Sequence, residues 1–201
     1  MDSEKTVRAA AFARRSIRKY TDRPLSQNEI ADIVAIAGRA PSPSNLQPWR
    51  VVAVVDADTK TKLMEACNNQ SQVGDSAATL VVYTDMEDTL AHVEDTIHPG
   101  MSDRAEEIAA RHRKTFSEMA ESDKHWWGRA QGYTFMAYLL LEAESRGLGT
   151  SPMLGFDPDK VKSLLNLPSH AEIPVIIAMG TPNEDGFEPF RHKTERILRF
   201  I

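Results

Sequence analysis

Residues 126–145 read WWGRAQGYTFMAYLLLEAES, and this stretch says the most about the fold. Between Tyr133 and Leu141, large apolar side chains go almost completely round a helix, and a helix that is apolar on every side must be buried on every side. A chain of 201 residues with a few short strands offers limited cover for the far face. A partner subunit could supply that cover, so this helix predicts a dimer. A central core helix in a monomer is the alternative.

The flanking sequence predicts strands separated by helices. Ser26 and Glu29 form a capping box at the start of a helix, which Pro41 and Pro43 end. Asp157 and Pro158 are a typical N-cap and first residue of another helix. The remaining elements follow from apolar periodicity. Helices are expected over residues 26–39, 58–67 and 126–145, and strands over 51–55, 80–83 and 174–179. This pattern indicates an α/β or α+β sheet covered by helices.

One segment departs from the pattern. Residues 85–124 are rich in charged side chains and histidine and contain few large apolar residues. We expect exposed helix and loop there, as an excursion from a single domain that spans residues 1–201.

Composition excludes several classes of protein. The chain has 24 Lys and Arg against 29 Asp and Glu, a net charge of −5, which argues against a dedicated nucleic-acid binder. No apolar run approaches the ~18 residues needed to span a bilayer, and residues 1–8 lack a signal-peptide pattern. Cys67 alone forms neither an internal disulfide nor a thiolate metal site, and the histidines lack metal-ligand spacing. We expect a soluble, cytoplasmic protein without a metal, and no membrane or nucleic-acid partner.

Three segments carry chemistry, while the phosphate loop, the nucleophile elbow and a complete dinucleotide fingerprint are missing. The first, residues 14–20, reads RRSIRKY and offers the guanidinium and hydroxyl donors that a phosphate monoester requires; a solvated basic turn is the alternative. The second, residues 40–49, reads APSPSNLQPW, a rigid polar loop that can hold a planar heterocycle by its edges; an ordinary Pro/Ser turn is the alternative. The third, residues 149–156, is a glycine-bounded loop in which small residues allow close approach of a ligand.

These segments occur in the order and spacing of the FMN-dependent nitroreductase family, which the chain resembles over most of its length. The motif Pro41-Ser42-x-x-Asn45-x-Gln47-Pro48-Trp49 is the most specific part of the resemblance. It implies an α+β fold with a central, mainly antiparallel sheet flanked by helices. It also implies an entwined homodimer with FMN at the subunit interface, a lid at 85–124 and a C-terminal arm at 181–201. The apolar end of that arm is expected to pack on its own chain or on the partner.

The resemblance also implies which residues contact FMN. Arg14, Arg15 and Ser16 would hold the phosphate with help from the C-terminal tail, and Arg18 would lie near the pyrimidine edge, where it would favour the reduced flavin. The loop at 41–47 would reach the partner's flavin, one of Asn69, Gln70 and Gln72 would touch the ring edge, and residues 152–155 would lie along the ring, with the Leu154 N–H near flavin N5. Some relatives carry a carboxylate where this chain has Leu154. The expected set is Arg14, Arg15, Ser16, Arg18, Pro41, Ser42, Pro43, Asn45, Gln47, Gln70, Pro152, Met153, Leu154, Gly155, Arg191 and Lys193.

The implied activity is a ping-pong oxidoreductase in which NADH or NADPH reduces FMN and a nitroaromatic, quinone or similar acceptor reoxidises it. No indispensable catalytic side chain is expected, because the cofactor carries the chemistry. Two alternatives stay open: a specialised relative that destroys flavin or removes halogen, and a non-catalytic FMN-binding module. A preference for NADPH would need a cation near its 2′-phosphate, and Arg104, Arg111, Arg113 and Lys114 are all candidates.

Overall fold

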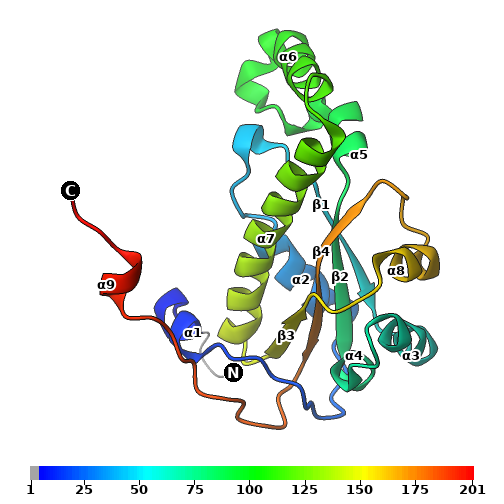
Figure 1. The fold of residues 1–201 in the computed structure, drawn as a ribbon, viewed down its shortest axis with the longest axis vertical. Helices are drawn as coiled ribbons and strands as arrows, with labels where there is room; N and C mark the ends of the chain where they lie inside the picture. The colour runs from blue at the N-terminus through cyan, green and yellow to red at the C-terminus, as the bar shows by residue number, and fades with distance from the viewer. Residues whose placement is uncertain (1–4) are drawn as a thin grey trace.

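The computed structural model describes residues 5–201 (Figure 1). Its α-helices are α1 (Val7–Ala13), α2 (Gln27–Ala37), α3 (Ala57–Ala66), α4 (Ser71–Asp75), α5 (Met86–Ala91), α6 (Ala105–Ser117), α7 (Glu121–Ser145), α8 (Pro158–Leu165) and α9 (Thr194–Ile197). Its 3₁₀ helices are η1 (Pro43–Asn45), η2 (Val93–Thr96) and η3 (Pro99–Arg104). Its strands are β1 (Trp49–Val54), β2 (Ala78–Thr84), β3 (Gly149–Met153) and β4 (Glu172–Gly180).

The four strands form one sheet in the order β1-β2-β4-β3, and every neighbouring pair is antiparallel. The two central strands, β2 and β4, are almost entirely buried, as their uninterrupted apolar runs predict. The expected α+β fold with an antiparallel sheet is therefore confirmed.

Helices cover both faces of this sheet (Figure 1). Alternate residues of a strand point to opposite faces, so Leu80 and Val82 of β2 pack with α2 and α7, whereas Val81 packs with α3, α4 and α8. Cys67 belongs to the second core, where burial raises the pKa of its thiol to about 11. At neutral pH Cys67 is therefore a neutral thiol in the core. The sheet, with a helical layer on each face, is the middle layer of three.

The sequence-based expectation is wrong at the third chemical segment, where β3 replaces the first part of the predicted loop. Gly149 and Pro152 give this stretch little strand propensity. It forms a strand because it lies at the edge of the sheet, where a proline is tolerated. The strand matters for the site because it places the buried Thr150 near one of its ends and Met153 at the other.

The boundaries of the long helix also differ from expectation. α7 begins at Glu121, five residues before the predicted start. Apolar periodicity missed the first turn because its residues are polar and exposed. Phe135 and Leu139 lie in the core, but Trp126 is 71% exposed and Tyr138 is 40% exposed. One copy of the chain therefore leaves part of this helix uncovered, and the predicted dimer stays a prediction.

The segment at residues 85–124 has a small core of its own, which its charged sequence did not suggest. Met86, Val93 and Phe116 are buried there, and Phe116 makes an edge-to-face contact with Trp127 of α7 at a centroid distance of 5.0 Å. Leu46, beside η1, belongs to the same cluster. The segment thus forms a packed cap at one end of α7 (Figure 1).

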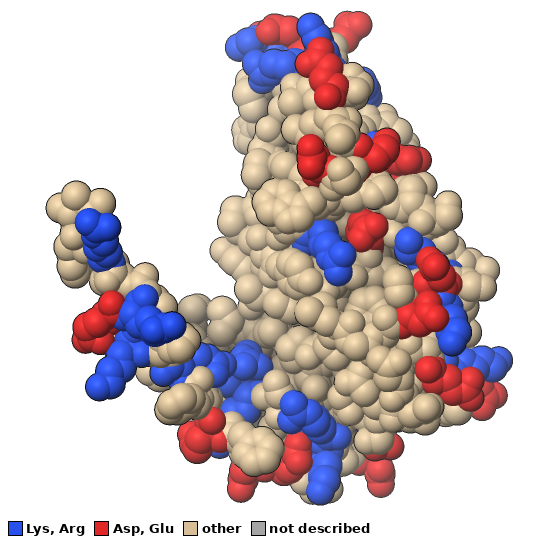
Figure 2. All heavy atoms as spheres, in the orientation of Figure 1, with Lys and Arg blue, Asp and Glu red and all other residues tan. Residues whose placement is uncertain are grey.

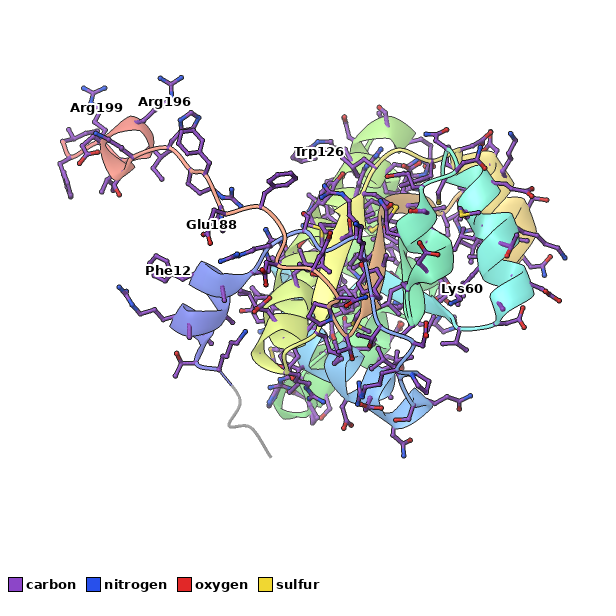
Figure 3. All side chains as sticks on the ribbon, turned by 90° about the horizontal axis from the view of Figure 1, so that it is seen from below. Phe12, Lys60, Trp126, Glu188, Arg196 and Arg199 are labelled. Atoms are coloured by element: carbon purple, nitrogen blue, oxygen red, sulfur yellow. The ribbon has the colours of Figure 1, made fainter. Side chains whose placement is uncertain are left out.

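The C-terminal residues do not pack back on their own chain. Phe187 is 89% exposed and Phe200 is 87% exposed, and the arm that ends in α9 stands away from the body. Figure 3 shows Arg196 and Arg199 near the end of this arm, with Phe12 exposed on α1 on the same side of the molecule. In the described residues the apolar tail is exposed rather than packed on its own chain, and its packing on a partner stays a prediction.

The capping box at α2 gives a prediction about stability. The Ser26 hydroxyl accepts from the Glu29 N–H, and the Glu29 carboxylate accepts from the Ser26 N–H at 2.8 Å. These bonds, with Arg23 beside them, lower the pKa of Glu29 to about 2. Ser26→Ala should cost about 1 kcal/mol of unfolding free energy at pH 7. Because the folded-state pKa is lowered, the Glu29 contribution is complete above about pH 4.5 and is lost as the pH falls towards 2. Urea unfolding at several pH values should therefore show a flatter acid limb for Glu29→Gln, and an unchanged limb would contradict the assignment.

Candidate functional site

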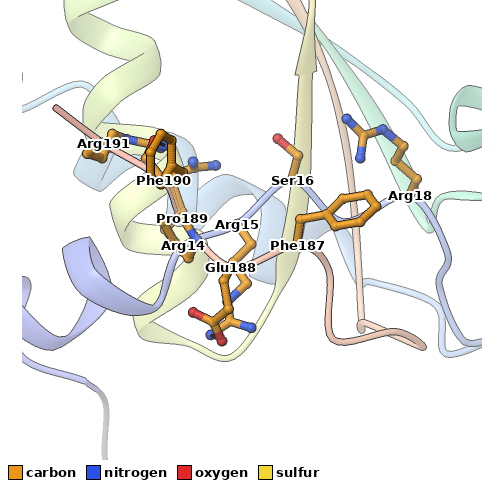
Figure 4. Close-up of a pocket in the computed structure, with 9 residues that line it drawn as sticks. All are labelled: Arg14, Arg15, Ser16, Arg18, Phe187, Glu188, Pro189, Phe190 and Arg191. Atoms are coloured by element: carbon orange, nitrogen blue, oxygen red, sulfur yellow. Dashed lines mark hydrogen bonds and ion pairs between the residues drawn. The ribbon is translucent and has the colours of Figure 1, made fainter.

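A polar cavity of about 210 Å³ lies between the segment that follows α1 and the base of the C-terminal arm (Figure 4). Its lining residues are Arg14, Arg15, Ser16, Arg18, Phe187, Glu188, Pro189, Phe190 and Arg191. Five residues predicted from the sequence for phosphate or flavin binding thus meet in one place, although Arg191 is 173 positions beyond Arg18 in the chain. Lys193, which was predicted for the same phosphate site, occupies the N-cap position of α9 and is exposed outside this lining.

The backbone around Ser16 is fixed by the edge strand. Ser16 forms a parallel bridge with Thr150, and the Ile17 N–H donates to the Thr150 carbonyl at 2.9 Å. This close approach requires glycine at 149, because a Cβ there would lie 2.8 Å from Ile17 Cβ. The hydroxyl of Tyr20 donates to the Ile17 carbonyl at 2.6 Å and also lies 3.2 Å from the Ala178 carbonyl of β4, which ties the segment to the sheet. The cavity wall is therefore anchored to β3 and β4.

Within residues 5–201, two buried side-chain polar atoms have no hydrogen-bond partner, and both belong to this region. They are Nη1 of Arg14 and Oγ1 of Thr150. Leaving a buried polar group unsatisfied costs about 1–3 kcal/mol, and more for a charged group. Such an atom at a cavity wall can be satisfied by an ordered water or by a polar group of a ligand, and the hydroxyl of Thr150 is a feature that reading the sequence did not single out.

The charges around the cavity favour an anion. Burial lowers the pKa of Arg14, and the nearby Arg191 lowers it further, while Glu144 opposes the effect. Arg14 still carries its charge at neutral pH, because a guanidinium is not deprotonated in proteins. Arg15 is paired with Glu188 at 2.8 Å, and this is the one carboxylate in the lining. Figure 2 shows Lys and Arg gathered at the base of the arm, where the surface is hollowed. A phosphate there would neutralise cations that now repel each other.

A second group of predicted residues meets at the other end of β3. The side-chain amide of Gln70 donates to the Gly155 carbonyl at 2.8 Å and to the Cys67 carbonyl at 3.0 Å. Asn69 adopts a left-handed conformation with φ of 55°, which asparagine tolerates. Leu154 is 61% exposed and follows Met153 at the strand end. Gln70 and the segment 152–155 thus form one surface, connected to the cavity by β3.

The loop at residues 41–47 lies far from this cavity, towards the opposite end of α7. Leu46 packs near Trp127, whereas Arg14 lies near Glu144, so about 25 Å of α7 separates the loop from the cavity. Ser44, Asn45 and Gln47 all have positive φ, which costs non-glycine residues of order 1–3 kcal/mol each.

Polar contacts hold this loop in its strained conformation. Ser42 Oγ accepts from the Gln47 N–H at 3.1 Å, and Gln47 Nε2 donates to Asn45 Oδ1 at 3.0 Å. Asn45 Nδ2 donates to the Thr96 carbonyl of η2 at 2.8 Å, while Pro41 and Pro43 are exposed. The structure does not bring this predicted group to the cavity of the same chain.

Other classes of site find no support in the part of the chain that the structure describes. Within residues 5–201, no cluster of three or more His, Cys, Asp or Glu is arranged to hold a metal ion. Over the same residues, no helix combines the length and the apolar character that crossing a membrane requires.

Comparison with known proteins points to one family. The model of the nitroreductase family matches residues 11–181. A protein of Thermus thermophilus named NADH dehydrogenase is 43% identical over 193 residues, covering 96% of this chain and 94% of that protein.

Solved structures agree with this result. A nitroreductase-like protein from Streptococcus mutans superposes with a TM-score of 0.85 at 27% identity, covering 96% of each chain. A protein from Exiguobacterium sibiricum, described as a nitroreductase in complex with FMN, superposes with a TM-score of 0.90 at 22% identity, covering 100% of this chain and 99% of the other.

Proposed function

Because the chain belongs to the nitroreductase family, we propose that it is an FMN-dependent oxidoreductase. It takes electrons from NADH or NADPH and reduces nitroaromatic, quinone or similarly electron-poor acceptors in a ping-pong sequence. The observation that carries this proposal is the buried, unpartnered Nη1 of Arg14 in a cavity lined by four arginines. The FMN-bound structure from Exiguobacterium sibiricum, which has the same fold, supports the choice of cofactor.

The cavity fits the phosphate of FMN. Arg14, Arg15 and Ser16 supply charged and hydroxyl donors from one extended segment, and Arg191 supplies another guanidinium from the arm. Charge-assisted hydrogen bonds from arginine are the strong kind, and their planar forks match a phosphate. Lys193 adds positive charge farther along the tail.

The ring system would lie along the end of β3. Residues 152–155 present backbone and a small glycine there, so a flat ring can approach closely. The Leu154 N–H would face the reactive edge of the flavin, and Gln70 would hold the neighbouring Gly155 in place through its 2.8 Å hydrogen bond.

When bound, FMN supplies the chemistry: it accepts a hydride from the nicotinamide and delivers reducing equivalents to the acceptor. The residues of the chain would bind and orient FMN and tune its reduction potential, and none is required as a nucleophile or general acid. This division explains why the residues that meet at the cavity and at the end of β3 are donors and small residues rather than a catalytic dyad.

A homodimer completes the proposed site. The 41–47 loop lies about 25 Å along α7 from the cavity of its own chain, so a partner would have to bring its loop to this FMN. Pro41, Ser42, Pro43, Asn45 and Gln47 would then contact the flavin across the interface. The incompletely covered α7 and the extended arm support this assembly.

Arg18 provides a test of flavin tuning. Its guanidinium lines the same cavity, and in Figure 4 it lies on the opposite side of Ser16 from Arg14. A positive charge near the pyrimidine edge stabilises the negative charge of reduced flavin. Arg18→Gln should therefore lower the midpoint potential of bound FMN by a few tens of millivolts, since 30 mV corresponds to about 1.4 kcal/mol for a two-electron couple. Spectroelectrochemistry should show this shift, while the adjacent Lys19→Gln leaves the potential unchanged. Equal midpoint potentials in the wild type and Arg18→Gln would contradict the placement of Arg18 beside the flavin.

Steady-state kinetics test the activity itself. Initial rates with varied NADH or NADPH, at several fixed concentrations of a nitroaromatic or a quinone, should give parallel double-reciprocal lines. Loss of the flavin chromophore without an acceptor would instead identify a flavin-destroying enzyme, and halide release would identify a dehalogenating one. Retention of FMN without turnover would identify a binding module. Each of these three results would overturn the proposed oxidoreductase.

A further inference from the structure

A second pocket, of about 570 Å³, lies between the 41–47 loop and the cap at residues 85–124. This volume is in the range typical of small-molecule sites. Its lining residues are Ser44, Asn45, Thr96, Ile97, His98, Met101, Ile108, Arg111 and His112. Since Ser44 and Asn45 belong to the loop proposed to face the partner's flavin, this pocket would adjoin the dimeric active site.

Ion pairing distinguishes the cations of the cap. Arg104 donates twice to Glu107, at 3.2 Å each, and Arg113 donates to Glu94 at 2.7 Å. These two arginines already have carboxylate partners, and Lys114 lies 3.9 Å from Glu118.

Arg111 differs from the other three. Within residues 5–201 it forms no ion pair within 4.0 Å, and it is the one of the four that lines the pocket. Its exposed guanidinium keeps all its donors available. The structure therefore singles out one cation where the sequence offered four.

The rest of the pocket suits a nucleotide. Ile97, Met101 and Ile108 supply an apolar wall for a flat base. The Nδ1 atom of His98 accepts from the Gly100 N–H at 3.0 Å, so a neutral ring carries its proton on Nε2 and can donate there. His112 is half-buried, and burial together with the neighbouring Arg111 lowers its pKa. An anion bound at Arg111 would offset that repulsion.

We propose that this pocket binds the adenosine part of the nicotinamide donor and that Arg111 holds one of its phosphates. The inference rests on the proposed function, because it places the donor beside the 41–47 loop. Two sources offer the same chemistry: the 2′-phosphate, which only NADPH carries, and the pyrophosphate, which both donors carry. Arg111 is thus a residue that determines donor affinity, and in the first case it also determines donor preference.

Equilibrium binding of unreactive nucleotides tests this proposal without turnover. Isothermal titration of the FMN-loaded protein would use adenosine 2′,5′-bisphosphate, ADP and adenosine. In Arg111→Gln, affinity for at least one phosphorylated probe should fall about tenfold or more, as expected for loss of a charge-assisted hydrogen bond, while adenosine is unaffected. Arg104→Gln, on the same cap but paired with Glu107, is the matched control and should bind like the wild type.

The pattern of losses identifies the phosphate. A loss confined to the bisphosphate assigns Arg111 to the 2′-phosphate. A loss shared by the bisphosphate and ADP, which have the 5′-phosphate in common, or a loss confined to ADP assigns it to the pyrophosphate. Wild-type affinity of Arg111→Gln for both probes, or no binding of either probe to the wild type, would overturn the inference. The proposed function fails separately, because it requires retained FMN that NADH or NADPH bleaches, whatever residue 111 is.

Discussion

Arg14→Ala is expected to purify as a folded protein that has lost most of its FMN. In the wild type, Nη1 of Arg14 is buried at the cavity wall without a partner, so its interaction would be with the ligand. Losing a hydrogen bond to a charged group costs about 1.5–3 kcal/mol. FMN should therefore bind about tenfold to a hundredfold more weakly.

The same substitution should leave folding almost unchanged. Burial and Arg191 both disfavour the charge on Arg14 in the ligand-free protein, as the lowered pKa indicates. Removing that charge therefore removes an unfavourable term from the free energy of folding. Flavin content per chain, measured from absorbance, and apoprotein melting temperature test the two halves together. Arg8→Ala, on the same helix but outside the cavity lining, is the matched control. Full flavin content in Arg14→Ala would contradict the phosphate assignment.

Deletion of residues 194–201 should convert the proposed dimer to monomer at micromolar concentration. The deletion removes Ile197, Leu198, Phe200 and Ile201, all of them exposed in the single chain, and leaves the cavity lining intact. Burying such side chains against a partner contributes about 1.5–3 kcal/mol each. After discounting for ordering of the arm, a loss of about 4 kcal/mol or more raises the dissociation constant at least about a thousandfold.

Sedimentation velocity across a concentration series measures this effect. Arg199→Ala in the full-length chain keeps the apolar side chains of the arm and should sediment as the wild type does. If the truncated chain dimerises with unchanged affinity, the arm is not part of the interface, and the uncovered face of α7 would have to provide it alone.

The elements that the sequence predicts well are those with a strong local signal. The apolar runs of β2 and β4 and the capping box of α2 each appear within a few residues. They indicate a sheet covered by helices, whereas the α+β class with an antiparallel sheet came from the family resemblance. β3 was not predicted from the sequence because its strand geometry comes from pairing with β4 rather than from its own residues. Likewise, the core of the cap depends on Phe116 meeting Trp127, a contact made in three dimensions.

The candidate site divides in the same way. The segment at residues 14–18 indicates phosphate chemistry by composition alone, and Arg191 lies beside it in the same cavity, where the family resemblance had placed it. Local sequence carries no distances, so it could not show that Asn45 lies far from Arg14 in one chain. Nor could it show that Glu94 neutralises Arg113 across 19 positions and thereby leaves Arg111 as the available cation. Tertiary contacts decide both points.

A visible absorption spectrum, followed by anaerobic titration with NADH and then NADPH, tests the central claim most directly. We predict a yellow protein with flavin bands that bleach when either nucleotide is added, which establishes cofactor and electron donor together. A colourless protein that cannot be reconstituted with FMN, or a yellow one that neither nucleotide bleaches, would contradict it.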